Sequence, residues 1–175
     1  AWRVTSDDKY IYKLNQLTES WCKSNPVNSG INWVCGQEVS IRLIHAIQSW
    51  LILDLDEKLP IPTKNRIAFV KVHLERISST KIYAKSQDNN HWISEATALF
   101  IGGTWLEKID KNYKVESTQY AKEGRKSLEE SVNKLIMEDG SFSQHSINYH
   151  RLVLDTLVLA EIWRSEEHTS ELQSP

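Results

Sequence analysis

The sequence predicts an all-α protein built from stacked antiparallel α/α hairpins. Three observations lead to this prediction. Apolar residues recur at steps of three and four along most of the chain, as they do on one face of a helix. Short polar segments rich in Asn, Asp, Gly and Pro separate these stretches. No stretch shows the sustained apolar and polar alternation of a half-buried strand.

The first part of the chain holds two full helices. The opening AWRVTSDDKY indicates the end of one helix, a polar turn and the start of another, so we expect the natural chain to begin further upstream. Residues 8–24 predict an amphipathic helix that the motif NPVNSG ends. Residues 36–54 are apolar around most of the circumference, which predicts a helix buried on more than one side, and the motif KLPIP after them predicts a loop.

Four more helices follow. An apolar stripe predicts a helix over residues 63–79, with Thr63 as its cap, and a shorter helix is expected over residues 91–105. Residues 116–137 form the next helix, which Asp139-Gly140 ends, and residues 148–163 form the last. The short polar connections indicate antiparallel neighbours. No fixed repeat period is present, which disfavours tetratricopeptide-like arrays. Periodicity alone does not decide whether the helix pairs close into a ring or continue as an open solenoid.

The length and composition predict one domain, or part of one, over residues 1–163. The chain has 175 residues, and 40% of them are hydrophobic, which is enough for a substantial core. The final RSEEHTSELQSP, residues 164–175, has no apolar period and resembles the translation of a sequencing-adapter oligonucleotide. We interpret it as a non-native tail and expect the fragment to be truncated at both ends.

Charge and cysteine content exclude several classes of function. The net charge is −2, and the tail supplies one arginine and three glutamates, so the remainder is near neutral. Such a chain has no overall basic field for nucleic acid. Cys22 and Cys35 form no CxxC or Cys/His ligand pattern, so we expect free buried thiols, no metal site and no cofactor. No window is apolar over the roughly 20 residues that cross a bilayer, so no membrane partner is expected.

Three polar segments each precede or open a predicted helix. They are GINWVCGQEVSIR at 30–42, DNNHWISEA at 88–96 and DGSFSQHSINYHR at 139–151. Because alternate helix ends share a rim in a layer of hairpins, these segments are expected to converge there. Convergence would make a polar cleft.

These segments carry a family resemblance. SGINWVCGQEVSIRLIHAIQSW, NNHWISEA and DGSFSQHSINYHRLVLD resemble, in order and separation, motifs of the heparinase II/III polysaccharide lyases and the related alginate and oligoalginate lyases. The resemblance extends over nearly all of residues 1–163. It implies a fragment of an (α/α) toroid whose β-sandwich region is missing. It also implies an acidic polysaccharide substrate, heparin-like or alginate-like, and a periplasmic or secreted enzyme, although no targeting segment is visible.

The implied reaction is β-elimination at a uronic acid, in which the proton removed lies beside a carboxylate. An enzyme must hold that carboxylate with donors that bind the developing dianion better than the ground state. The resemblance gives this role to Asn90 and His91, at the positive end of the helix that they open. It makes Tyr149 the proton donor to the leaving oxygen and, in some members, also the base. The family usually recruits another histidine from beyond this region, so the catalytic set in the fragment is expected to be incomplete, which can leave the fragment inactive on its own.

Each catalytic candidate has a structural alternative. Asn89 or Asn90 can cap a helix, an interaction of about 1 kcal/mol, and Asn89 is the expected cap. His91 can be a surface histidine, but a protonated imidazole is disfavoured at a helix N-terminus, so a neutral hydrogen-bonding role is expected. Tyr149 can be an ordinary core aromatic at the first turn of its helix.

A second set of residues is predicted to bind substrate. Glu38 and Arg42 stand four apart and form either a surface pair or, as we prefer, a buried pair that shapes the groove floor. Glu95 stands four residues after His91 and orients it or makes a plain surface pair. Tryptophans of the motifs stack on sugar rings or pack in the core. The full set comprises Asn32, Trp33, Glu38, Arg42, Trp92, Glu95, His150 and Arg151.

Two other functions compete with a lyase. A toroidal glycoside hydrolase needs an acidic pair around the scissile bond, for which Asp88, Glu95 and Asp139 are available. A non-catalytic helical scaffold for carbohydrate or protein would instead use Trp2, Trp105 and Trp163. A lyase differs from both because its product absorbs ultraviolet light. The sequence identifies neither the polymer nor the oligomeric state.

Overall fold

The computed structural model describes the backbone of residues 1–54 and 62–172 and the side chains of residues 1–53 and 62–165. Within these ranges the chain is helical, and its only β-type pairing is an isolated bridge between Ile136 and Phe142. The all-α prediction is therefore confirmed. The predicted KLPIP loop falls mainly on residues 55–61, outside the described residues.

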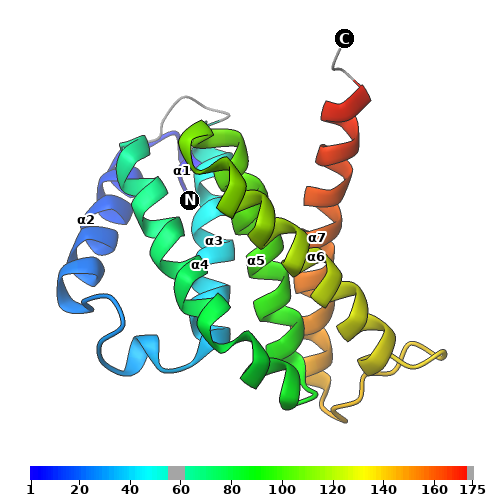
Figure 1. The fold of residues 1–175 in the computed structure, drawn as a ribbon. Coiled ribbons are helices and arrows are strands. Elements are labelled where there is room, and N and C mark those ends of the chain that lie inside the picture. Colours follow the sequence, from blue (N-terminus) through cyan, green and yellow to red (C-terminus); the bar gives the residue numbers. More distant parts are fainter. Residues whose placement is uncertain (55–61, 173–175) are drawn as a thin grey trace.

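The helices alternate in direction (Figure 1). Those numbered α3, α5 and α7 begin at one end of the structure, and the intervening α4 and α6 run back from the other end. Two 3-10 turns, η1 and η2, lie in the connections. The elements are α1 (Trp2–Thr5), α2 (Lys9–Ser24), η1 (Ile31–Trp33), α3 (Gly36–Asp54), α4 (Thr63–Ser86), α5 (Asn90–Ile109), η2 (Lys111–Tyr113), α6 (Lys114–Leu135) and α7 (Ile147–Leu172).

The opening of the chain follows the prediction, whereas three helices, α4, α5 and α7, are longer than predicted. Helix α1 ends at Ser6, which adopts a left-handed φ of 52°, and α2 follows directly. Helix α4 continues to Ser86. The prediction stopped earlier because Ile82 and Tyr83 are exposed in its last turns, so the apolar stripe fades before the helix ends. Helix α7 continues through the predicted tail to Leu172.

The predicted cap of α4 is wrong. Thr63 is the first helical residue, and the N-cap position is Pro62, which offers no side-chain acceptor. The Thr63 hydroxyl instead accepts a hydrogen bond from Nη2 of Arg66 at 3.1 Å. The cap assignment failed because proline fixes the backbone at the position that a capping residue would occupy.

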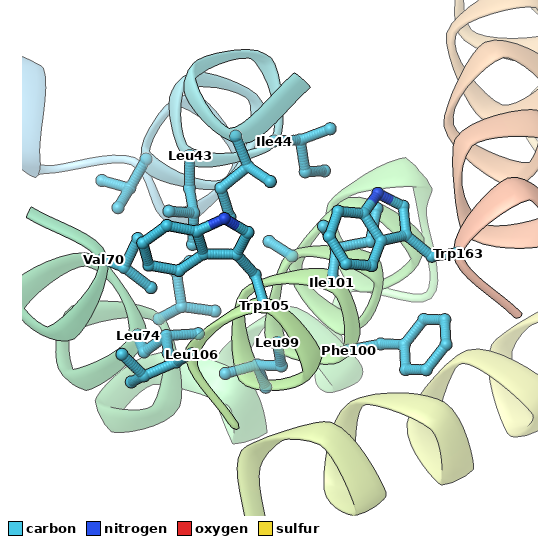
Figure 2. Close-up of a cluster of buried hydrophobic side chains, with 14 of the residues drawn as sticks. Leu43, Ile44, Val70, Leu74, Leu99, Phe100, Ile101, Trp105, Leu106 and Trp163 are labelled. Carbon is cyan, nitrogen blue, oxygen red and sulfur yellow. The ribbon is translucent and has the colours of Figure 1, made fainter. Parts of the chain in front are cut away.

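Helix α5 lies at the centre of the fold. Its residues from Trp92 to Leu106 are all buried, because α3, α4, α6 and α7 surround it. In Figure 2 the α5 side chains of Leu99, Ile101 and Trp105 lie among side chains of α3, α4 and α7. Helix α3 also buries more than one face, as predicted. The labelled neighbours are Leu43, Ile44, Val70, Leu74, Phe100, Leu106 and Trp163.

Helices α5 and α6 pack with their backbones in contact. A Cβ on Gly103 would collide with the backbone of Ser117 and Ala121 on α6, and one on Gly124 would collide with the α5 backbone at Phe100. Glycine at both positions allows the two helices to approach more closely than side chains would permit. This contact holds α6, and the segment that follows it, firmly against α5.

The segment between α6 and α7 folds back on itself. Backbone N–H groups of Met137 and Ser143 donate to the carbonyls of Ser141 and Leu135, each at 2.8 Å, and Gly140 takes the left-handed φ of 81° that the turn requires. Phe142 is buried in a second apolar cluster with Trp92, Ile93, Leu135 and Val153. The segment therefore has a fixed position beside the start of α5.

Candidate functional site

The start of α5 is held by capping and by a long-range hydrogen bond. Asn89 has extended backbone angles, and its side-chain oxygen accepts from the His91 N–H at 2.9 Å, so Asn89 is the cap, as expected. The next backbone N–H, that of Asn90, donates to Oε1 of Gln144 at 3.0 Å. Gln144 lies 54 residues further along the chain, so this bond joins the second polar segment to the third.

The side chain of Asn90 is buried and incompletely bonded. Asn90 is only 1% exposed, and its Nδ2 has no hydrogen-bond partner among the described residues. A buried amide donor without an acceptor is unfavourable by roughly 1–3 kcal/mol, and such groups are uncommon in folded proteins. An acceptor that reached this Nδ2 would therefore gain a hydrogen bond that the described residues leave unmade.

His91 follows Asn90 and is half-buried. Burial lowers the pKa of its imidazole below the usual value, which favours the neutral form. This direction agrees with the neutral state expected at a helix N-terminus. A neutral imidazole offers one N–H donor and one acceptor.

The start of α7 places Tyr149 at the surface. The residue is 46% exposed, so it is not the core aromatic that the alternative interpretation described. Its neighbour His150 is partly buried, with its ring centroid 6.3 Å from that of Phe142, and its backbone N–H donates to the Ser146 carbonyl at 2.9 Å. Arg151 is exposed and lies 3.9 Å from Asp155, which makes a surface pair.

The first polar segment also reaches α5. Nε2 of Gln37 donates to the Ser94 hydroxyl at 3.4 Å. Gly36, the first residue of α3, lies so close to the Glu95 carboxylate that a Cβ there would collide with it. Together with the Gln144 bond, these contacts bring all three polar segments to the end where α3, α5 and α7 begin (Figure 1).

Glu95 lies against the first residue of α3. It is 4% exposed, and its Oε2 has no hydrogen-bond partner among the described residues. Burial raises the pKa of its carboxyl to about 7, and the nearby Arg76 opposes that shift. No hydrogen bond joins Glu95 to His91 in the described part of the chain, so the predicted orienting pair is not formed there.

The predicted buried pair of Glu38 and Arg42 is wrong. Glu38 is exposed, whereas the Arg42 guanidinium donates from Nε to Nε2 of His73 at 3.0 Å and from Nη2 to the Asn32 carbonyl at 3.1 Å. Helix spacing suggested a partner four residues away, but the buried acceptor is on α4. Asn32 is partly buried, and its side-chain amide donates to Oδ1 of Asn25.

Two candidate sugar-stacking residues belong to the core. Trp33 is 3% exposed and lies against Trp21 and His73. Trp92 is also 3% exposed, and its Nε1 donates to the Ser127 hydroxyl at 2.8 Å. Neither indole presents a face on which a sugar ring can stack, so the core interpretation holds for both.

Sequence reasoning missed four residues that make contacts between elements. Gln144, Gly36 and Gln37 lie inside the polar segments, and their position there was the available signal. His73 stands in an ordinary apolar stripe and gave none. All four act through partners on other helices, which spacing along one helix does not reveal.

Further features qualify the sequence predictions. Cys22 and Cys35 are free thiols, but Cys22 is exposed and Cys35 is only partly buried, so the expectation of buried thiols is wrong. Over the described ranges, no three His, Cys, Asp or Glu side chains are grouped so that they could bind a metal ion. No helix in the same ranges has the length and apolarity needed to span a bilayer.

The fold and this polar end define a class of protein: an all-α domain of paired helices with a candidate site made at helix N-termini. The chain belongs to the heparinase II/III family, because the family model described as Heparinase II/III N-terminus matches residues 1–173.

A curated relative agrees with this assignment. It is a heparin-sulfate lyase from Bacteroides thetaiotaomicron, 24% identical over 176 aligned residues, which cover 99% of this chain and 24% of the relative. The chain thus spans about a quarter of that relative's length. No solved structure matches the chain.

Proposed function

We propose that the complete protein carrying this chain is a polysaccharide lyase that cleaves a uronate-containing polymer by β-elimination. In this proposal Asn90 and His91 bind the substrate carboxylate, and Tyr149 transfers the proton to the leaving oxygen. Family membership supports the reaction class, and the heparin-sulfate lyase relative supports an acidic polysaccharide as substrate.

One observation carries the proposal. The hydrogen bond from the Asn90 N–H to Gln144 ties the start of α5 to the segment that leads directly into α7 and Tyr149. Helices α5 and α7 begin at the same end of the molecule, and Asn90 and Tyr149 lie in their first turns (Figure 1). In this proposal a substrate at that end contacts the amide, imidazole and phenol groups together.

The chemistry of these groups suits a developing dianion. Removal of the proton beside a carboxylate places a second negative charge on the same unit, so donors that strengthen as charge develops lower the barrier. The unpaired Nδ2 of Asn90, a neutral His91 and the positive end of α5 supply such donors. A phenol whose reference pKa is about 10 suits proton donation to the leaving oxygen.

The buried position of Asn90 sets a requirement. Its donor is covered in this structure, so the substrate carboxylate must displace part of that cover to reach it. Gln144 accepts from the backbone N–H of Asn90 and not from Nδ2, so exchange of that bond for a substrate contact would add a second Asn90 donor without uncovering the first.

Among the described residues, the three acids named for a hydrolase do not form an acidic pair open to a substrate. Asp88 pairs with Lys134 at 2.6 Å, and Oδ1 of Asp139 accepts from the Ser141 N–H at 2.9 Å. Glu95 is buried against Gly36. Each of the three acids is therefore occupied in a local structural contact or enclosed between helices.

Other parts of the proposal come from the family alone. The missing β-sandwich region and a further histidine outside this chain complete the catalytic set, and the helices belong to an (α/α) toroid. The enzyme acts in the periplasm or outside the cell on a heparin-like or alginate-like polymer. The interpretation of residues 164–175 as a non-native tail rests instead on their likeness to a translated adapter, and the family match extends to residue 173.

The test uses the complete protein that carries this chain and a uronate polymer. Replacing Tyr149 with Phe removes the transferable proton while keeping the ring, and we expect the rate of double-bond formation to fall at least about 100-fold. Tyr12→Phe is the matched control, because Tyr12 is an exposed tyrosine on α2, and its rate should stay unchanged. Equal rates for Tyr149→Phe and Tyr12→Phe would remove Tyr149 from the mechanism.

A further inference from the structure

A hollow lies beside α3, apart from the contacts around Asn90. It has a volume of about 570 Å³ and lies between α2, α3 and α4, within the roughly 300–1,000 Å³ range of small-molecule sites. Its lining includes Thr18, Trp21, Ser24, Asn25, Arg42 and Phe69. None of these residues takes part in the contacts around Asn90.

The Arg42 side chain is fixed in this hollow by neutral groups. Its guanidinium carbon lies 4.5 Å from the Trp21 ring centroid and 5.0 Å from that of Trp33. Nδ1 of His73 lies 2.7 Å from the Phe69 carbonyl, which can only accept, so Nδ1 carries the proton and Nε2 accepts from Arg42. Burial lowers the pKa of His73 to about 4, which keeps the ring neutral near pH 7.

The charge of Arg42 is therefore not compensated by a bonded acid. Its acceptors are a neutral imidazole and a backbone carbonyl, and across the described side chains no carboxylate forms an ion pair with it. Burial lowers the pKa of Arg42, while the exposed Glu38 raises it only through space. A half-buried guanidinium without a counter-ion is unfavourable, and an anion in the hollow would relieve that.

We propose that this hollow binds the carboxylate of an acidic sugar. Arg42 has five N–H donors, of which the two hydrogen bonds described use two, and the remaining Nη donors suit a planar anion. Trp21, which is partly exposed, and Phe69 supply apolar ring faces for the sugar, and the Ser24 hydroxyl lines the same hollow. These contacts indicate that the ligand is an anion. The further step, that the anion is the carboxylate of a uronic acid, rests on the proposed function.

The experiment titrates the complete protein that carries this chain with glucuronate, glucose and inorganic sulfate, with Trp fluorescence and calorimetry as readouts. Glucuronate should bind, glucose should bind at least about tenfold more weakly, and Arg42→Gln should weaken glucuronate at least about tenfold. Lys23→Gln removes a positive charge from the exposed part of α2 and should leave the affinity unchanged.

Two additions keep the result interpretable. Arg76 independently binds the Trp33 and Val34 carbonyls, each at 2.9 Å, so η1 retains support in Arg42→Gln. Ala46→Phe fills the hollow without removing an Arg42 hydrogen bond and should also abolish binding. Binding of sulfate alone would replace the carboxylate assignment, and absence of binding or equal binding in Ala46→Phe would overturn the site. Glucuronate binding should persist in Tyr149→Phe, so the test of this hollow is independent of the test of the lyase proposal.

Discussion

Glu95 is the residue whose chemistry differs most from its sequence context. A glutamate in a polar motif near a helix start suggested an exposed or groove-lining acid, but the side chain is enclosed between α5 and the first residue of α3. Its burial with one unbonded oxygen makes the charged form unfavourable in the folded state.

The raised pKa of Glu95 predicts a pH dependence of stability. The folded pKa of about 7 exceeds the ordinary value of 4.5, so the folded state binds this proton more tightly, and stability falls as pH rises from about 4.5 to 7. Glu95→Gln removes this titration. The difference in free energy of unfolding between the variant and the wild type should therefore favour the variant more at pH 8 than at pH 5, by roughly 3 kcal/mol at most.

The measurement is urea unfolding of both proteins at the two pH values. His73 has the opposite effect, because its folded pKa is lowered and the protein therefore loses stability as pH falls. His73 is present in both proteins, so its effect cancels in the comparison. The same wild-type to variant difference at pH 5 and pH 8 would show that Glu95 has an ordinary pKa.

Local chemistry was predictable at some residues and not at others. The cap at Asn89 followed from an Asn placed directly before an apolar helical pattern, because a cap depends only on the next few residues. The environment of Arg42 could not be predicted, because its acceptor His73 lies 31 residues away on α4. Side chains whose partners are on other helices escape any inference from spacing along one helix.

At the scale of elements, the contact between α5 and α6 depends on glycine. Gly124→Ala places a methyl group against the α5 backbone, which cannot move aside as a side chain can. The intrinsic helix preference of alanine favours the variant by about 1 kcal/mol, yet we expect a net loss of about 1–3 kcal/mol in the free energy of unfolding.

Gly102→Ala is the matched control for this prediction. Its new methyl group meets only the side-chain ends of Leu43 and Leu74, which can shift, so the loss should be smaller. Urea unfolding measures both. A Gly124→Ala protein at least as stable as Gly102→Ala would show that the two helices are not in backbone contact.

The helices themselves were the most predictable part of the structure. Periodicity marked α2, α3 and the central part of each later helix, because those residues face the core. It failed at the ends of α4 and α7, where Ile82 and Tyr83 face solvent and residues beyond Trp163 carry no apolar pattern. A helix can continue beyond the residues that pack against other helices. Apolar periodicity in the sequence marks only the packed residues.

At the scale of the molecule, alternating helix directions gather the polar segments at one end. That convergence was expected from short connections between helices, and the Asn90, Ser94 and Glu95 contacts with other segments agree with it. Closure of the helices into a ring was not predictable from periodicity, because neighbouring pairs pack alike in a ring and in an open array. The ring stays part of the proposal.

The central claim is that the complete protein breaks a uronate polymer by elimination at this end of the helices. The most direct measurement follows ultraviolet absorbance and new reducing ends together while the complete protein acts on the polymer. The account predicts that both rise in equal molar amounts, because each cleavage creates one unsaturated uronate and one reducing end. Reducing ends that appear without absorbance would contradict it, since they would show hydrolysis in place of elimination.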